Sequence, residues 1–272
     1  MKIPSVKLPG SNSIPQIGLG LWQVKDQSEF KTSFEAGLKY GYRHFDSAQA
    51  YVNEQFLGEA WKQSGHGREE LFITTKIAVQ NFGYNKAQRT FAESLEKLQT
   101  DYVDLLLLHF PVPLLRKKSW QALEAIHTTG QAKTIGVSNY MIRHLEEMKD
   151  YAKVLPAVNQ VELHIFLQQP ELVKYCQDHD IVVEAYSPLA HARAMDNDVI
   201  VGIAKKHHKT YAQIMLRWCI ERGMVVLPKS VTPSRIEQNI DIFDFRLDND
   251  DMKLIAAQDQ DLRTAWSPVH IP

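Results

Sequence analysis

Eight short apolar runs recur along the chain, and each is followed by a segment with the mixed polar and apolar pattern of a helix. The runs are QIGLGLW (16–22), YRHFD (42–46), LFITTK (71–76), YVDLLLLH (102–109), AKTIGVSN (132–139), AVNQVEL (157–163), IVVEAYS (181–187) and MVVLPK (224–229). Their nearly continuous apolarity is typical of parallel strands that are covered on both faces. Eight strands that alternate with helices predict a closed (β/α)₈ barrel, the TIM barrel.

Further segments add to this barrel. The first 15 residues carry PG and SN turn signals between short alternating runs, which predicts a hairpin that caps the barrel bottom. Segments 197–208 and 211–222 both have a helical pattern before the last strand, so one of the two helices is extra. Another helix is expected at 249–258, before a short carboxyl-terminal tail. Because no linker divides the chain, residues 1–272 are expected to form a single domain.

Composition excludes several classes of function. The net charge is -1 and the basic residues are scattered, so nucleic acid is not an expected partner. The amino terminus lacks the apolar core of a signal peptide, and no stretch of about 18 apolar residues could cross a membrane. Cys176 and Cys219 are far apart and have no CxxC companion, which indicates free buried thiols in a reducing cytoplasm.

Four chemically complementary residues follow neighbouring predicted strands. Asp46 ends the second strand, Lys76 the third and His109 the fourth, while Tyr51 lies in the loop after the second. Taken singly, each has an ordinary structural explanation, such as a loop carboxylate or a packed ring. Together they lie at the carboxyl face of the barrel, where TIM barrels carry their functional groups.

These residues suit proton donation to a carbonyl oxygen. A tyrosine has an ordinary pKa of about 10, and a nearby ammonium is expected to lower it toward the working range. Asp46 would hold Lys76 in place, and His109 could hydrogen-bond the oxygen of a bound carbonyl. The set stabilises an oxygen that gains negative charge, and it contains neither a nucleophile nor a metal motif such as HExxH.

Carbonyl reduction needs an electron source, so a nucleotide site is expected. No Walker A sequence is present, and GLGLWQ has Gln23 where a dinucleotide fingerprint needs its third glycine. The segment PKSVTPSRIEQN (228–239) instead places Lys229, Ser230 and Arg235 around a predicted helix N-terminus, a natural phosphate site.

The ordered motifs GLGLW, DSAQAYVNE, TTK, LLLLHFP, IGVSN, NQVELH, YSPL and LPKSVTPSRIEQN closely resemble the aldo-keto reductase superfamily. The resemblance spans about residues 4–245, and the short tail is similar to that of bacterial 2,5-diketogluconate-reductase-type members. It implies NADPH-dependent reduction of small-molecule aldehydes or ketones, with Tyr51 as general acid beside Asp46, Lys76 and His109. The resemblance also implies a set of cofactor-binding residues: Ser138, Asn139, Gln160, Tyr186, Ser187, Leu189, Lys229, Ser230, Arg235, Gln238 and Asn239.

The chain departs from the family pattern at several positions. Gln238 replaces a usual glutamate, and Ala190 replaces a common glycine after YSPL. Ala78 and Phe110 stand where many relatives carry tryptophan. We expect Trp22, Ala78, Phe110 and Trp266 to line the substrate pocket, and the small Ala78 to widen it toward bulky or aromatic carbonyls.

Two other functions are compatible with parts of the pattern. One is a non-catalytic NADPH-binding or interaction subunit of the same fold, which the intact set of four residues disfavours. The other is an isomerase or lyase that uses Lys76 in a Schiff base, which Asp46 disfavours because it would keep Lys76 protonated. The physiological carbonyl is not determined by these motifs, and a cytoplasmic monomer is expected.

Overall fold

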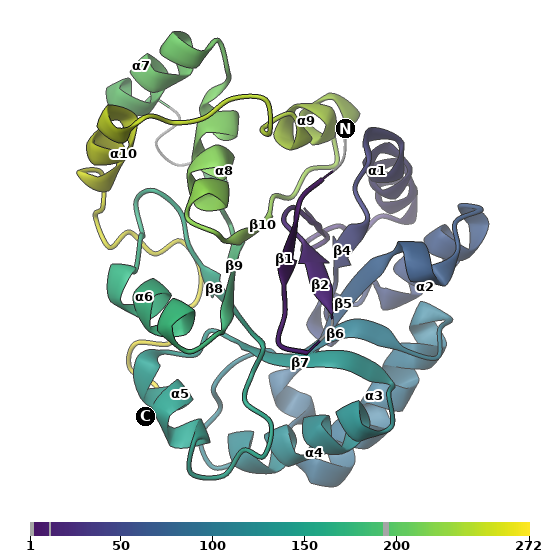
Figure 1. Ribbon diagram of the computed structural model, residues 1–272. Coiled ribbons are helices and arrows are strands. Elements are labelled where there is room, and N and C mark those ends of the chain that lie inside the picture. Colours follow the sequence, from purple (N-terminus) through teal and green to yellow (C-terminus); the bar gives the residue numbers. More distant parts are fainter. Residues whose placement is uncertain (1–2, 11, 193–195) are drawn as a thin grey trace.

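A closed ring of parallel strands forms the centre of the molecule (Figure 1). The computed structural model describes residues 3–10, 12–192 and 196–272, and within these ranges it contains an eight-stranded sheet. Its strands are β3 (Leu19–Gly20), β4 (His44–Asp46), β5 (Phe72–Ile77), β6 (Val103–Leu108), β7 (Ala132–Ser138), β8 (Val158–Glu162), β9 (Val182–Tyr186) and β10 (Val225–Leu227). Consecutive strands pair in parallel, and the backbone N–H of Gly18 closes the ring by donating to the Val226 carbonyl at 2.9 Å. The predicted TIM barrel is confirmed.

Helices surround this ring, as Figure 1 shows. They are α1 (Gln27–Tyr40), α2 (Glu54–Gln63), α3 (Tyr84–Leu98), α4 (Arg116–Thr128), α5 (Ile142–Met148), α6 (Pro170–Asp178), α7 (Asp198–His207), α8 (Tyr211–Glu221), α9 (Pro233–Ile240) and α10 (Asn249–Ala256). The apolar stripe of α3 is buried at Ala87, Phe91, Leu95 and Leu98, as an amphipathic helix on a barrel requires. Both α7 and α8 precede β10, so the extra helix expected there is present.

A hairpin closes one end of the barrel. Its strands, β1 (Ser5–Lys7) and β2 (Ser13–Pro15), pair antiparallel and lie across the ring in Figure 1. Leu8 and Ile14 are buried in one apolar cluster with barrel residues that include Phe72 and Leu105. The hairpin therefore caps the barrel bottom, as expected, and leaves the carboxyl face for function.

The GLG sequence explains why β3 is the shortest barrel strand. A Cβ atom added to Gly18 would lie 2.6 Å from His44 Nδ1, and one added to Gly20 would lie 3.2 Å from the Leu227 carbonyl oxygen. Only glycine allows the first strand to pass this close to the last one and to His44. These glycines therefore serve barrel closure rather than a phosphate loop.

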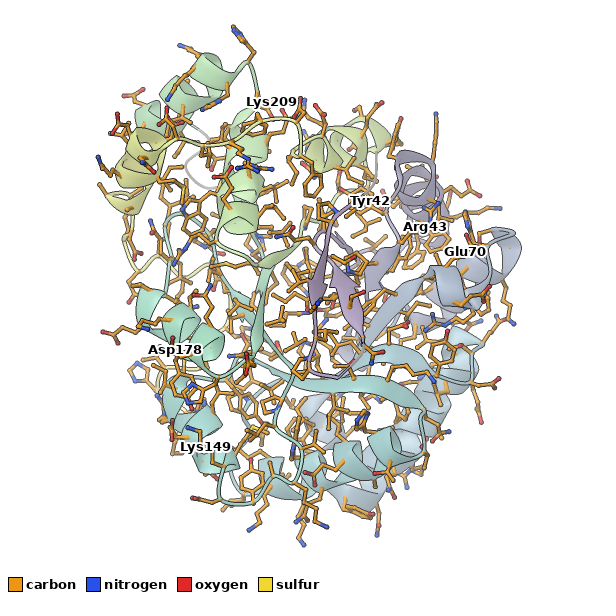
Figure 2. All side chains as sticks on the ribbon, viewed as in Figure 1. Tyr42, Arg43, Glu70, Lys149, Asp178 and Lys209 are labelled. Carbon is orange, nitrogen blue, oxygen red and sulfur yellow. The ribbon has the colours of Figure 1, made fainter. Side chains whose placement is uncertain are left out.

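Side chains fill the ring, and the labelled Glu70, Lys149 and Asp178 lie on its outside (Figure 2). Across the described ranges, no helix combines the length and the apolarity needed to cross a bilayer.

Candidate active site

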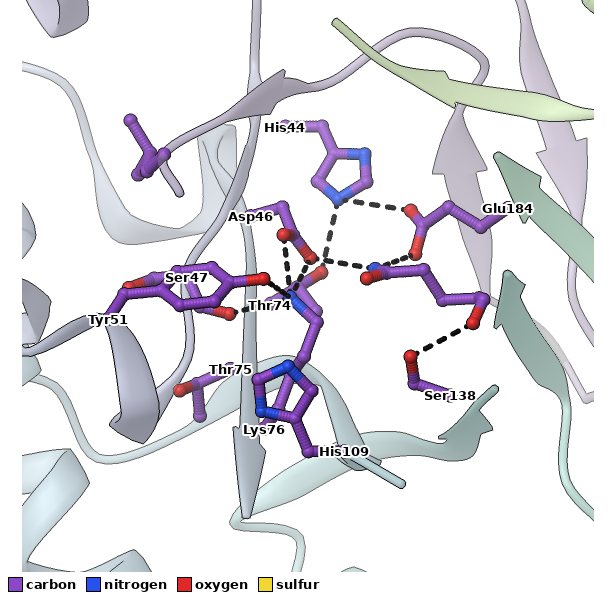
Figure 3. A network of polar contacts seen from close by, with 12 residues as sticks. His44, Asp46, Ser47, Tyr51, Thr74, Thr75, Lys76, His109, Ser138 and Glu184 are labelled. Atoms are coloured by element: carbon purple, nitrogen blue, oxygen red, sulfur yellow. Dashed lines mark hydrogen bonds and ion pairs between the residues drawn. The ribbon is translucent and has the colours of Figure 1, made fainter. Parts of the chain in front are cut away.

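The carboxyl ends of β4, β5 and β6 bring Asp46, Tyr51, Lys76 and His109 together (Figure 3). The Lys76 ammonium donates to both Asp46 carboxylate oxygens at 2.6 and 2.7 Å, and to the Ser47 carbonyl at 2.9 Å. It also lies 3.3 Å from the Tyr51 hydroxyl oxygen. Lys76 is fully buried, so its charge depends on these partners.

The polar residues of DSAQAYVNE hold the loop that presents Tyr51. Ser47 donates to Asn53 Oδ1 at 2.8 Å, and Asn53 Nδ2 donates to the carbonyls of Leu21 and Val24 at 2.9 and 3.1 Å. The Gln49 amide oxygen accepts from the backbone N–H of Ala78 at 2.9 Å. These bonds tie the loop to neighbouring strand ends, so the position of the tyrosine is determined by the surrounding barrel.

The net electrostatic effect on Tyr51 differs from the sequence-based expectation. Burial raises the pKa of Tyr51 above its ordinary value, and the Lys76 ammonium only partly offsets this effect. The expected lowering of the Tyr51 pKa was therefore wrong in its net direction. Burial also disfavours the charged form of Lys76, but Asp46, Tyr51 and Glu184 together outweigh it, and the pKa of Lys76 is raised. The resting site thus holds a neutral phenol beside an ammonium.

His109 lies beside Tyr51, with ring centroids 5.7 Å apart. Burial, together with repulsion from Lys76, lowers the pKa of His109 to about 3. The imidazole is therefore neutral at ordinary pH and can donate one N–H to a substrate oxygen.

A second buried carboxylate, which we did not identify from the sequence, lies behind the four residues. Gln160 Nε2 donates to Asp46 Oδ2 at 2.8 Å and to Glu184 Oε2 at 2.6 Å, so one amide joins the two acids (Figure 3). His44 completes this buried group, with its Nε2 3.1 Å from the Thr74 hydroxyl oxygen. A signal was present in the sequence, because Glu184 interrupts the otherwise apolar start of the run IVVEAYS.

Residues expected to hold the carboxamide form one hydrogen-bonded group at the ends of β7 and β9. Tyr186 donates to Asn139 Oδ1 at 2.8 Å, and Asn139 Nδ2 donates to the His109 carbonyl at 3.2 Å. Ser138 donates to the Gln160 carbonyl at 2.9 Å. The amide nitrogen of Gln160 is engaged by the two acids, which leaves its amide oxygen as the group available to a ligand.

The loop after β9 contains several residues in the left-handed region of φ. Ser187 and Ala190 both have φ 50°, although neither is glycine. Ser187 Oγ lies 3.0 Å from His191 Nε2, and Leu189 packs against the barrel core. A left-handed φ explains the glycine that relatives often carry at the position of Ala190, because an alanine there is strained.

The phosphate-binding residues expected after β10 surround the N-terminus of α9. Lys229 and Arg235 are exposed, and neither has an ion-pair partner within the described ranges. Ser230 is buried and accepts from the backbone N–H of Thr232 at 3.1 Å. Farther along the helix, Gln238 is exposed and Asn239 is buried. Two unpaired cations next to a helix N-terminus form a suitable site for a phosphate dianion.

Of the residues expected to line the substrate pocket, three lie at the open mouth. Trp22 and Trp266 are 42% and 77% exposed, and the ring of Trp266 lies edge-on to Phe110, with centroids 6.3 Å apart. Ala78 is fully buried instead. The structure therefore gives no support to the wide pocket that its small side chain was expected to open.

The tail that carries Trp266 is held on both sides, another feature that the sequence did not reveal. Glu162, at the end of β8, accepts from the Thr264 hydroxyl and backbone N–H, both at 2.6 Å. Arg143 on α5 donates to the carbonyls of Pro268 and Val269 at 3.0 and 2.8 Å. Burial alone would raise the pKa of Glu162, but hydrogen bonds from His164, Thr264 and the Ala265 backbone lower it to about 2, so Glu162 stays ionised.

Comparison with known proteins agrees with this geometry. The profile of the aldo/keto reductase family matches residues 16–260. The chain is 44% identical to a glyoxal reductase of Bacillus subtilis over 264 residues, covering 97% of this chain and 96% of that protein. It is also 44% identical to the methylglyoxal reductase DkgA of Escherichia coli O157:H7, with the same coverage of both chains. A Bombyx mori aldo-keto reductase solved in complex with NADP superposes with a TM-score of 0.92 at 31% identity, covering 97% of this chain and 95% of that one. The protein therefore belongs to the aldo/keto reductase family.

Proposed function

We propose that the protein reduces aldehydes or ketones to alcohols with NADPH, and that Tyr51 is the general acid. The observation that carries this proposal is the 3.3 Å contact between the Tyr51 hydroxyl oxygen and a Lys76 ammonium held by Asp46. Membership of the family and the NADP complex of the Bombyx mori relative support the choice of cofactor.

Each of the four residues has a distinct task in this proposal. Bound NADPH supplies the hydride that the carbonyl carbon receives. Tyr51 transfers its proton to the carbonyl oxygen, and Lys76 stabilises the phenolate that remains. Asp46 keeps Lys76 charged and in position, while His109, as a neutral imidazole, donates a hydrogen bond that orients the carbonyl.

The chemistry of the loop after β10 fits a 2′-phosphorylated nucleotide. Lys229 and Arg235 would engage the phosphate, and Ser230 would add a hydroxyl. Ser138, Asn139 and the free amide oxygen of Gln160 would hold the carboxamide, with Tyr186 beneath the ring. Ser187 and Leu189 would contact the pyrophosphate, and Gln238 and Asn239 the adenine.

Small carbonyls with a second oxygen next to the aldehyde are the proposed substrate class. The two bacterial relatives at 44% identity are named for glyoxal and methylglyoxal. Trp22, Phe110 and Trp266 offer apolar walls at the mouth, whereas Ala78 is fully buried. The small α-oxoaldehydes therefore replace bulky aromatic carbonyls as our first candidates.

The test is NADPH oxidation, followed by its absorbance, against a panel of glyoxal, methylglyoxal, aromatic aldehydes and sugar-derived ketones. We expect turnover with several members and the highest kcat/KM for the α-oxoaldehydes. If NADPH binds and no carbonyl is reduced, the protein is a non-catalytic binding subunit and the proposal is wrong.

We also propose that the enzyme acts as a monomer in a reducing compartment such as the cytoplasm. Cys176 and Cys219 are both buried and free, which supports a compartment that does not form disulfides. Sedimentation of the purified protein would test the assembly state.

A further inference from the structure

The buried group behind the four residues contains two acids but one ammonium. Asp46 and Glu184 are 3% and 0% exposed, and both accept from the same Gln160 amide nitrogen, at 2.8 and 2.6 Å. Lys76 is fully occupied by Asp46, the Ser47 carbonyl and Tyr51. Figure 3 shows this chain of contacts running from Tyr51 through Lys76 and Asp46 to Glu184.

Few charges face Glu184 from the surrounding strands. β4 supplies Asp46 and a His44 whose Nε2 lies 3.6 Å from Glu184 Oε1, β5 supplies Lys76, and β8 supplies the uncharged Gln160. The pKa of His44 is lowered to about 3 by burial, so it brings no positive charge. Strand β10, the other neighbour of β9, contributes only Val225–Leu227. Glu162, farther along β8, is engaged by the tail.

A second negative charge in this group would lack compensation. The Glu184 Oε1 atom has no hydrogen-bond partner in the part of the chain that the structure describes. An unpaired buried carboxylate is costly, and two acids that share a site do not both ionise readily. Asp46 takes the single ammonium, so Glu184 is the member that keeps a proton.

We propose that Glu184 is a positioning residue: as a neutral acid, it holds Gln160 against Asp46. Its ionisation weakens Tyr51 as a proton donor, and this second part rests on the proposed reduction. Burial, with the Asp46 charge in second place, raises the pKa of Glu184 to about 8. Above that pH the group of Asp46, Lys76 and Glu184 changes from a net charge of zero to -1. The added negative charge opposes the phenolate that proton donation leaves on Tyr51, so reduction slows as pH rises through about 8.

The test compares the pH dependence of single-turnover hydride transfer in the wild type and in Glu184→Gln. Glutamine keeps the length and the acceptor for Gln160 but cannot ionise. In the wild type we expect the rate to fall about three- to tenfold between pH 7 and pH 9. This fall corresponds to a rise of up to about one unit in the pKa of Tyr51. In Glu184→Gln the fall should be less than about twofold, because the pKa of Tyr51 itself is raised and contributes little in this range.

Glu54 offers a matched control. It is also a buried acid with a pKa raised by burial, and it accepts from the Thr75 hydroxyl at 2.6 Å. It has no hydrogen bond to Gln160 or Asp46 among those that the described residues make. Glu54→Gln should therefore keep the wild-type decline between pH 7 and pH 9, and the decline shows that the effect belongs to Glu184 rather than to any buried acid.

A second measurement does not depend on activity. Infrared spectra should contain a protonated carboxylic acid band that disappears as the pH is raised through about 8 and is absent from Glu184→Gln. Should that variant not fold, Glu184→Met serves for the assignment of the band.

The inference is overturned if Glu184→Gln retains the wild-type decline, or if the band persists in the Glu184 variant that is measured. Absence of hydride transfer in the wild type at every pH overturns the proposed function and the kinetic half of this inference. The band still reports the protonation of Glu184 in that case, so the two failures are distinguishable.

Discussion

At the scale of single residues, the site holds a tyrosine whose proton is bound more tightly than in water. Burial raises the pKa of Tyr51, so Lys76 does not activate it by ionising it in advance. Lys76 acts after transfer, because a phenolate 3.3 Å from an ammonium is stabilised in a site that excludes water. Removing either member of the buried Asp46–Lys76 pair would leave an uncompensated charge, which costs about 3–5 kcal/mol.

Tyr51→Phe should remove the proton donor and little else. We expect kcat to fall by about 10² to 10⁴-fold, the usual contribution of general acid catalysis, while the Kd for NADPH changes little. Tyr102→Phe, at a tyrosine that packs against Arg68 before β6, is the control and should keep wild-type turnover. A Tyr51→Phe enzyme with near-native kcat would remove Tyr51 from the role of acid.

The neutral state of His109 predicts the acid side of the pH profile. Its folded pKa of about 3 lies below the ordinary value of 6.5, so the imidazole stays neutral until the pH falls far below neutrality. The kcat/KM for reduction should therefore stay level between pH 7 and about pH 5, measured with one carbonyl at saturating NADPH. An acid-side loss with a midpoint near 6.5 that His109→Asn removes would contradict this assignment.

At the scale of elements, loops after different strands supply different parts of the site. The loop after β4 supplies the acid, and the segment between β10 and α9 supplies the cations for a phosphate. Because Lys229 and Arg235 have no ion-pair partner in the described ranges, their charges are available to a ligand. Cofactor choice should therefore be separable from proton transfer by substitution.

Lys229→Ala and Arg235→Ala should each weaken NADPH binding at least tenfold and leave NADH binding nearly unchanged. A charge-assisted hydrogen bond contributes roughly 1.5–3 kcal/mol, which corresponds to a factor of ten or more in Kd. Lys174→Ala, at an exposed lysine on α6, is the control for a general loss of positive charge. Fluorescence titration with both nucleotides measures the effect. Equal affinity of the wild type for NADPH and NADH would contradict the assignment, and Gln238 would then be examined as the cause.

The sequence predicted the elements better than their interior contacts. Each apolar run became a barrel strand, because continuous apolarity is what a strand buried on both faces requires. The contacts of Gln160 with Asp46 and Glu184 were not predictable in the same way, since only the folded barrel brings both acids within 3 Å of the Gln160 amide nitrogen. Burial was equally invisible, which is why the direction of the Tyr51 pKa and the position of Ala78 differed from expectation.

At the scale of the whole molecule, the two ends of the barrel have different functional roles. The carboxyl end carries the polar groups, the exposed tryptophans and the tail held by Glu162 and Arg143. The opposite end is closed by the β1–β2 hairpin, which buries Leu8 and Ile14 in an apolar cluster. In TIM barrels the amino-terminal end, which the hairpin closes here, contributes to stability, and the carboxyl end carries the chemistry.

A substitution at the closed end should therefore change stability without changing catalysis. Ile14 is fully buried between the hairpin and the barrel, so Ile14→Ala leaves a cavity that costs about 2–5 kcal/mol, whereas Ile14→Val costs about 0.5–1.5 kcal/mol. Thermal unfolding should show a Tm that falls by about 2–4 °C per kcal/mol in a chain of this size. At 25 °C, well below both transitions, kcat and KM should match the wild type, since Ile14 packs in the apolar cluster at the end of the barrel opposite the carboxyl face. Ile14→Ala could instead raise the KM for NADPH or for the carbonyl while the protein is still folded. The two ends would then be coupled through the barrel interior, and the assignment of stability to one end and catalysis to the other would be wrong.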